Sequence, residues 1–339
     1  MKNNRHNYDE YETLFDPMKT DRQARRKRKP KAKHQPKKAA PEILDEIADP
    51  IALEGGFKIT YVPSLYEAEW LLSSLNTFYD QHFITDVMAQ VKGGKEASVY
   101  RCLAHPSVGT EYIAAKVYRP RRFRSLSNDA MYREGRETLR ADGKAVQGNE
   151  DRVIRALGKK TAFGLQVAHT SWLMHEYTTL ELLHNLGAPV PKPYAVGENG
   201  ILMSYIGDEN LAAPTLNRVR LETDEAHRLF KRVIQTILLM LENDIIHGDL
   251  SAYNILYWEG DITIIDFPQV VHSQSNSAAR MILKRDVTRI CEYFATQGVE
   301  TNPEALTENL WKRVSPFSAE THTAERLYLM EGYTDAEDR

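Results

Sequence analysis

The chain of 339 residues contains little cysteine and no long apolar run, and each shortage excludes a class of protein. Its two cysteines, Cys102 and Cys291, lie far apart without metal-ligand spacing. We therefore expect two free thiols, with neither a disulfide framework nor a structural zinc site. No apolar stretch approaches the ~20 residues of a membrane span, and the polar N-terminus lacks the apolar segment of a signal peptide. These features favour a cytoplasmic protein without a membrane partner.

The apolar fraction of 42% and the charged fraction of 27% are typical of a globular protein. The net charge of −3 conceals a basic segment. Residues 19–38 hold eleven Lys or Arg and one Asp, which gives this segment a charge of +10, so the rest of the chain has a net charge of −13. Such a segment buries little apolar surface, so we expect residues 1–60 to form a disordered basic extension. The segment favours an RNA or ribosomal partner through its phosphates, although a solubilising tail has the same composition.

Apolar periodicity predicts an α+β protein with a strand-rich first half and a helical second half. The expected helices cover residues 64–90, 171–187, 223–245, 278–296 and 303–315, and the expected strands cover 91–104, 110–119 and 201–207, with a hairpin inside 245–269. In the helix expected at 171–187, Ser171 is the expected cap and Gly187 the expected stop. Residues 119–169, with twelve Lys or Arg against six Asp or Glu, are expected to form a flexible loop and a second RNA contact.

The stretch "IIHGDLSAYNILYWEGDITIIDFPQ" places polar residues in short loops between apolar runs. Asp249 and Asn254 lie five residues apart, and Asp266 follows Asp249 by seventeen. Ordinary polar turns would explain either aspartate alone, but not both at this spacing with Asn254 between them. Phosphoryl transfer needs carboxylate and amide oxygens on Mg²⁺ and a base that orients the acceptor, and these residues match that need.

A lysine and a glutamate upstream form a candidate ion pair. Lys116 lies in the strand "AAKVY", where an isolated lysine would usually be exposed. Glu176 shares a helix face with leucines three residues before it and four and seven residues after it. Because burying a carboxylate alone is costly, Glu176 needs a cation, and Lys116 is the expected partner.

A third candidate is the turn "GGKEASV", where glycines would let backbone N–H groups approach phosphates. Against the kinase pattern G-x-G-x-x-G-x-V only Gly94 and Val99 match, because Lys92 and Ala97 replace the outer glycines. A Gly-Gly hairpin turn explains the same residues.

Together these motifs resemble the RIO family of atypical serine/threonine protein kinases over roughly residues 60–315. The matching pieces are the basic segment 119–169, which we call the basic insert, and "GGKEASVY", "AAKVYR", "LMSYIG", "IHGDLSAYNIL", "IDFPQVV" and "LKRDVTRI". The resemblance is closest to the branch without an N-terminal winged helix. It implies a bilobal protein-kinase-like fold with a β-rich N-lobe at 61–205, a helical C-lobe at 206–318 and a C-terminal helix or tail at 319–339.

The resemblance also implies roles for single residues. Lys116, paired with Glu176, would bind the α- and β-phosphates of ATP. Asp249 would be the catalytic base, while Asn254 and Asp266 would hold Mg²⁺, with Mn²⁺ as an alternative metal. Asp266 is also a candidate acceptor of phosphate. The remaining ATP-binding residues would be Gly94, Lys95, Ser98 in the phosphate-facing turn, and the backbone of Ser204 and Ile206 at the adenine.

Three departures from ordinary protein kinases carry information. Gly248 replaces the arginine that pairs with a phosphorylated activation loop, so that route of activation is not expected. Pro268 replaces the glycine of Asp-Phe-Gly and restricts its φ, which should hinder a flip of this motif. No Ala-Pro-Glu follows Asp266, so no peptide-docking platform is expected. Asp286 in "KRDV" is expected to anchor the catalytic loop as a buried carboxylate.

Three functions therefore compete. The first is a serine/threonine protein kinase or ATPase that uses ATP and Mg²⁺, with its protein substrate open. The second is a small-molecule phosphotransferase of the aminoglycoside or choline kinase type, which shares His-Gly-Asp-x-x-x-x-Asn. The third is an ATP-dependent switch in assembly of the small ribosomal subunit, with little protein kinase activity.

Overall fold

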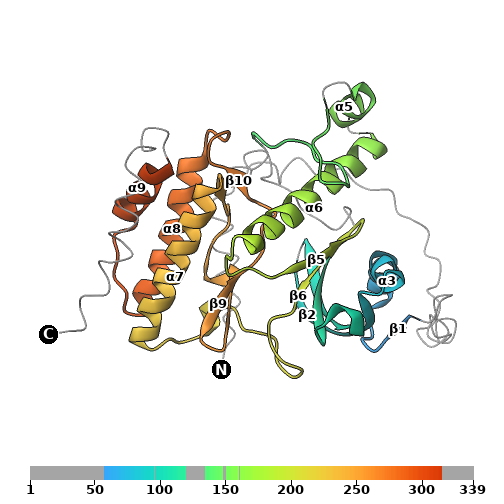
Figure 1. Cartoon of the computed structure of the whole chain (residues 1–339), viewed down its shortest axis with the longest axis horizontal. Coiled ribbons are helices and arrows are strands. Elements are labelled where there is room, and N and C mark those ends of the chain that lie inside the picture. The colour runs from blue at the N-terminus through green and yellow to red at the C-terminus, as the bar shows by residue number, and fades with distance from the viewer. Residues whose placement is uncertain (1–56, 95, 120–133, 148–149, 160, 315–339) are drawn as a thin grey trace, which may run out of the picture. The chain divides into compact units, whose positions relative to one another are not determined.

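The computed structural model describes residues 57–94, 96–119, 134–147, 150–159 and 161–314 (Figure 1). The basic segment 19–38 and the C-terminal segment 319–339 lie outside the described residues, so the predictions made for them stay predictions. Of the predicted extension 1–60, residues 58–59 form a short strand, contrary to the expectation of disorder there. Among the helices that the structure describes, none is both long enough and apolar enough to cross a membrane.

A six-stranded sheet forms the first half, in the order β1-β2-β3-β4-β6-β5. The pairs are antiparallel except β1 with β2. The strands are β1 (Lys58–Ile59), β2 (Ile84–Gly93), β3 (Ala97–Ala104), β4 (Tyr112–Tyr118), β5 (Pro193–Val196) and β6 (Gly200–Ser204). β5 was not predicted because Pro191 and Pro193 interrupt its pattern, and its edge position tolerates a proline.

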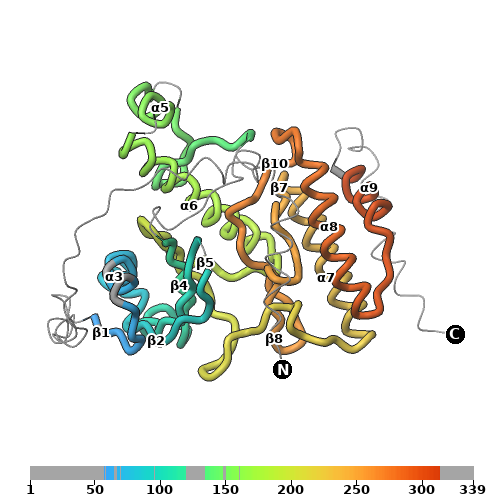
Figure 2. Tube along the Cα trace, turned by 180° about the vertical axis from the view of Figure 1, so that it is seen from behind, coloured from blue at the N-terminus to red at the C-terminus, as the bar shows by residue number. Residues whose placement is uncertain are grey.

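The sheet is covered by helices on both faces, α3 (Leu65–Asp80) on one and α6 (Ala162–Asn185) on the other (Figure 2). Alternation along β4 divides its side chains between two cores. Ile113, Ala115 and Val117 pack with α3, whereas Ala114 and Tyr118 pack with α6 and the helical half. The alternation therefore places Lys116 on the face that carries α6.

Three predicted boundaries around these helices were wrong. α3 ends at Asp80 and β2 starts at Ile84, so the helix expected over 64–90 is ten residues too long. α6 starts at Ala162, where the Thr161 hydroxyl accepts the N–H of Gly164 at 3.1 Å. Ser171 is therefore buried inside the helix and does not cap it. Most of the first turns of α6 are exposed and lack an apolar stripe, which concealed the true start.

The segment 119–169 contains helical structure that was not predicted. α5 (Asp151–Gly158) and the first turns of α6 occupy its second part, so the expectation of one long loop was wrong there. A Cβ on Gly164 would lie 2.0 Å from the carbonyl oxygen of Ala156, so only glycine permits α5 to approach α6 this closely.

The second half is built on α7 (Thr223–Glu242), α8 (Ala279–Thr296) and α9 (Pro303–Val314). Its short pieces are β7 (Ile245–Ile246) paired with β10 (Val271–His272), and the 3₁₀ helices η4 (Leu216–Arg218) and η5 (Ala252–Asn254). A further 3₁₀ helix, η2 (Pro106–Val108), lies between β3 and β4 in the first half. The predicted hairpin is confirmed as β8 (Ile255–Trp258) and β9 (Asp261–Ile264). Its turn residues Glu259 and Gly260 both have positive φ, as a type I′ turn requires.

The structure confirms the predicted α+β class, and both cysteines are buried free thiols as expected. The division into lobes at 205/206 stays a prediction.

Candidate active site

Lys116 lies between two carboxylates that come from distant parts of the chain. Its Nζ is 2.5 Å from Oε1 of Glu176 on α6 and 2.6 Å from Oδ1 of Asp266. The predicted pairing of Lys116 with Glu176 is therefore formed. The side chain of Glu176 is 1% exposed, whereas that of Asp266 is 41% exposed. One carboxylate thus fixes the lysine from the interior, and the other faces solvent.

Burial and mutual attraction set the charges of this trio. Burial alone would lower the pKa of Lys116, but Asp266 and Glu176 raise it above its usual range. Burial raises the pKa of Glu176, although Lys116 acts in the opposite direction. Burial would also raise the pKa of Asp266, yet the ammonium of Lys116 brings it below its ordinary value. Lys116 is therefore a permanent cation, and Asp266 is ionised at neutral pH.

Tyr118 completes the surroundings of Glu176. Its hydroxyl donates to Oε2 of Glu176, the oxygen that Lys116 does not contact. Tyr118 is two residues after Lys116, so strand alternation places both side chains on the same face. This alternation is visible in the sequence, but it does not by itself reveal that Tyr118 contacts Glu176.

The loop that carries Asp249 is anchored from α8. The N–H of Gly248 donates to Oδ2 of Asp286 at 2.9 Å, and Arg285 donates to the Gly248 carbonyl. Asp286 is buried, and burial raises the pKa of its carboxyl group. The prediction that Asp286 is a buried carboxylate is confirmed, and it anchors the loop that carries Asp249.

The glycine at position 248 has a geometric cause. Its φ is 82°, and a Cβ there would lie 2.1 Å from the carbonyl oxygen of Gln269. The loop after Asp266 thus passes directly against the loop before Asp249. Any side chain at position 248, the arginine of ordinary kinases included, would push these two loops apart.

Asn254 connects the loop that carries Asp249 with the segment that leads to Asp266. Its Nδ2 donates to the Asp249 carbonyl at 2.9 Å and to Oδ2 of Asp249 at 3.2 Å. The N–H of Ile265 donates to the Asn254 carbonyl at 2.9 Å, and Nε2 of His247 lies 3.1 Å from the Ile265 carbonyl. These bonds bring together the neighbourhoods of Asp249, Asn254 and Asp266, as the spacing predicted.

Arg289 is a site residue that the sequence analysis missed. Its Nη1 lies 2.8 Å from Oδ1 of Asp249, and both side chains are about two-fifths exposed. Arg289 is three residues after Asp286 on α8, which places both on the same side of that helix. This helical spacing was the available signal.

The residues around Asp266 fit magnesium better than a metal held entirely by protein. Mg²⁺ commonly takes one or two protein ligands and completes its shell with phosphate oxygens and water. Asp266 and Asn254 offer a carboxylate and an amide. Among the residues that the structure describes, no group of three or more His, Cys, Asp or Glu side chains could hold a metal ion. Asp266 has a φ of 75°, an unusual value that commonly occurs at functional positions.

The predicted phosphate turn contains a glycine that its geometry requires, while its contact with phosphate stays a prediction. The N–H of Gly94 donates to the Ala97 carbonyl at 2.9 Å, and a Cβ on Gly94 would lie 2.8 Å from that oxygen. The turn therefore requires glycine whether or not phosphate binds. Lys95 lies outside the described residues. Ser98 is in β3 rather than in the turn, and its fully buried side chain shares the α3 face with Tyr100, so the expectation of a phosphate-facing position was wrong.

The expected adenine contacts are constrained by existing bonds. The Ser204 N–H donates to the Lys192 carbonyl at 2.8 Å, and its hydroxyl accepts the Lys192 N–H at 3.0 Å. The Ile206 carbonyl accepts the Ala213 N–H at 3.0 Å. The backbone groups that remain as predicted adenine contacts are therefore the Ser204 carbonyl and the Ile206 N–H.

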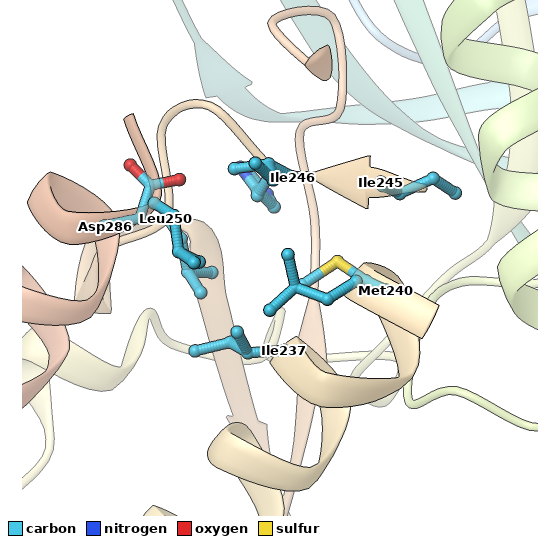
Figure 3. Close-up of a pocket in the computed structure, with 9 residues that line it drawn as sticks. Ile237, Met240, Ile245, Ile246, Leu250 and Asp286 are labelled. Atoms are coloured by element: carbon cyan, nitrogen blue, oxygen red, sulfur yellow. The ribbon is translucent and has the colours of Figure 1, made fainter. Parts of the chain in front are cut away.

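An apolar pocket lies beside the loop that carries Asp249 (Figure 3). It is lined by Ile237 and Met240 of α7, by β7 and by Leu250, with Asp286 at one side. Because Leu250 follows Asp249 directly and is 1% exposed, this packing supports the loop from the interior.

Comparisons with known proteins agree with this geometry. Residues 131–306, more than half of the chain, match the RIO domain family. The chain is 37% identical over 142 residues to a RIO-type serine/threonine-protein kinase Rio1 of Thermoplasma acidophilum, covering 42% of this chain and 73% of the relative. It is 28% identical over 242 residues to a serine/threonine-protein kinase RIO1 of Chaetomium thermophilum, covering 68% of this chain but only 43% of that relative.

The fold is similar to a solved structure described as the Rio2 kinase-ADP/Mg²⁺-phosphoaspartate complex from Chaetomium thermophilum. The TM-score is 0.50 at 22% identity, covering 79% of this chain and 72% of that chain. This likeness confirms the predicted bilobal kinase-like fold. The expected branch without a winged helix concerns residues that are mostly outside the described ranges, and it stays a prediction. The chain belongs to the RIO family, whose curated relatives named above are serine/threonine-protein kinases.

Proposed function

We propose that this chain uses ATP and Mg²⁺ to phosphorylate a serine or threonine of a protein. The observation that carries the proposal is the position of Lys116 between buried Glu176 and partly exposed Asp266. A permanent cation beside an ionised carboxylate matches the need to bind phosphate oxygens and a divalent metal together. The RIO domain match favours a protein kinase over the small-molecule phosphotransferase.

In the proposed mechanism, Glu176 and Tyr118 hold Lys116 so that its ammonium can bind the α- and β-phosphates. Asp266 and Asn254 would hold Mg²⁺, which, when bound, neutralises charge on the phosphate oxygens. The Asn254 amide also bonds to Asp249, so it would couple the metal site to the base.

Asp249 is proposed to act on the acceptor. Its carboxylate accepts the proton of the serine or threonine hydroxyl, and the hydroxyl oxygen forms a bond to the γ-phosphorus. The bond from that phosphorus to the bridging oxygen breaks, leaving ADP. Arg289 and Asn254 both contact the Asp249 carboxylate and would fix its direction.

A second candidate function is an ATPase-driven switch in which Asp266 itself accepts the phosphate. The similar structure is described as containing phosphoaspartate. In this chain Asp266 lies 2.6 Å from the phosphate-binding candidate Lys116, so a transferred phosphate at Asp266 would have a cation beside it. Hydrolysis of this acyl phosphate would complete an ATPase cycle.

An RNA or ribosomal partner in the cytoplasm is proposed from charge. Besides segment 19–38, the described part of the basic insert exposes Arg152, Arg155 and Lys159 on or beside α5. Deleting residues 19–38 should weaken binding to structured RNA and reduce its salt dependence. Unchanged binding would contradict this partner.

The test is incubation of the purified chain with ATP labelled at the γ-phosphate, alone and with a generic protein, alcohols or aminoglycosides. Label that survives acid and hydroxylamine indicates phosphoserine or phosphothreonine, hydroxylamine-labile label indicates phosphoaspartate, and free phosphate measures ATPase activity. Asp249→Asn and Asp266→Asn should abolish the stable label, whereas exposed Asp261→Asn should not. Full activity of both site variants, or fast saturable turnover of an alcohol, would contradict the proposal.

A further inference from the structure

The first described part of the basic insert contacts the loop that follows Asp266. We name residues 134–140 the strap. Nε of Arg136 donates to the Val270 carbonyl at 2.9 Å, and its Nη2 donates to the carbonyls of Pro268, at 3.0 Å, and Val270. These partners are more than 130 residues away in sequence. One guanidinium thus binds two carbonyls of the loop that carries the metal-binding candidate.

Further contacts fix the strap along the same segment. The Glu134 carboxylate accepts the Ser277 hydroxyl at 2.8 Å, and its carbonyl accepts the Asn276 amide at 3.2 Å. Gly135 has a φ of 78°, and a Cβ there would lie 2.7 Å from the Ser275 carbonyl oxygen. The strap therefore lies in direct backbone contact with residues 275–277.

The other end of the strap is bonded to α6, beside Glu176. The Glu137 carbonyl lies 2.7 Å from Nε2 of His175, the residue directly before Glu176. The Leu139 N–H donates to the Ser171 hydroxyl at 2.9 Å. Burial lowers the pKa of His175, so its ring is neutral and its Nε2–H can donate to this carbonyl. Through Arg136, Glu137 and Leu139 the strap thus joins the helix of Glu176 to the loop of Asp266.

The loop held by Arg136 also touches the catalytic loop. A Cβ on Gly248 would lie only 2.1 Å from the Gln269 carbonyl oxygen, so residues 268–270 contact both Arg136 of the strap and the residue before Asp249. In ordinary kinases the arginine absent at position 248 would connect these regions to an activation segment. Here Arg136 supplies a cation to the loop after Asp266.

We infer that the strap positions Asp266 relative to Glu176, with Arg136 as the positioning residue that holds the loop at 268–270. The consequence for catalysis rests on the proposed function, whereas the mechanical role does not. Without Arg136 the Pro268 and Val270 carbonyls would accept hydrogen bonds from water instead. The loop would then no longer hold the Asp266 carboxylate in one orientation. A kinase site of this design is held by its own insert and needs no phosphorylated loop.

The mechanical role is tested by hydrogen–deuterium exchange in the full chain. Arg136→Ala should increase exchange of the backbone amides of residues 265–271, and Gly135→Ala should do so without altering Arg136. The matched control is Arg140→Ala, since Arg140 lies on the strap but pairs with Asp142 and Glu150. Equal exchange in Arg136→Ala and Arg140→Ala would overturn the inference, whether or not the chain proves to be a kinase.

The catalytic consequence is tested by titrating Mg²⁺ at saturating ATP. Arg136→Ala should raise the Mg²⁺ concentration for half-maximal turnover about tenfold, as expected for loss of a charged hydrogen bond. Binding of ADP without metal should stay unchanged. Arg136→Lys keeps the charge but cannot bind two carbonyls in the same way, so it should recover only part of the loss. An unchanged Mg²⁺ requirement in an active Arg136→Ala variant would overturn the positioning of Asp266, while absence of turnover in the wild type would count against the proposed function alone.

Discussion

Replacing Lys116 by methionine should destabilise the fold as well as abolish activity. Glu176 is 1% exposed and lies 2.5 Å from the ammonium, so the change leaves a carboxylate in the interior without its cation. Removing one partner of a buried ion pair costs ~3–5 kcal/mol. Because the Tyr118 hydroxyl still donates to Glu176, we expect the lower end, about 3 kcal/mol. Asp266 adds little, since water can solvate its partly exposed carboxylate.

The assay is urea unfolding at pH 7 of the wild type, Lys116→Met, Glu176→Gln and the double variant. The double variant should recover about 2 kcal/mol relative to Lys116→Met, because it no longer buries a charge. Burial already holds the pKa of Glu176 above its ordinary 4.5, and loss of Lys116 raises it further. A raised carboxyl pKa gives stability that is present at low pH and lost as pH rises through the folded value. The difference between Lys116→Met and wild type should therefore shrink as pH falls toward 4.5. A loss below ~1 kcal/mol at pH 7, or additive effects in the double variant, would refute the reasoning.

Three further predictions concern the catalytic loop. Gly248→Ala should destabilise the chain by about 2 kcal/mol in thermal unfolding, because Gly248 has a positive φ and a Cβ there would lie 2.1 Å from the Gln269 carbonyl oxygen. Gly298→Ala is the control and should destabilise the chain less, since Gly298 also has a positive φ but faces open space. Equal losses of stability in the two variants would contradict the steric explanation. Arg289→Ala should lower kcat about tenfold with the KM for ATP unchanged, while Arg280→Ala, which lies on the same helix away from Asp249, should have no effect. Asp249→Asn should lower phosphate transfer by ~10²–10⁴ while ATP binding persists, and a parallel loss of binding would argue against a role as base.

The parts of the site that follow local rules could be predicted from the sequence. Apolar runs on either side of a Glu-Gly-Asp turn predicted the hairpin. The spacing of Asp249, Asn254 and Asp266 predicted that its flanking loops carry the candidate site. The position of Glu176 on an apolar helix face predicted its pairing with Lys116, since a buried carboxylate needs a cation.

The parts that depend on distant contacts could not be predicted in this way. Arg136 bonds to carbonyls more than 130 residues away, and neither the arginine nor those loop residues has a local pattern that reveals the pairing. Helix boundaries failed where the first turns are exposed without an apolar stripe, as at Ala162, and where a strand resembled a helix, as at Ile84. The prediction that Ser98 faces phosphate failed for a simpler reason. A shift of one residue along a strand moves a side chain to the other face of the sheet.

The central claim is that Lys116, Asn254 and Asp266 form one site for a metal-bound nucleotide. Its most direct test is electron paramagnetic resonance of Mn²⁺ titrated into the chain with and without ATP. We predict tight Mn²⁺ binding only with ATP, weakened at least tenfold in Asp266→Asn, Asn254→Ala and Lys116→Met, and unchanged in the exposed control Asp261→Asn. Equal Mn²⁺–ATP affinity in all four variants would contradict the account.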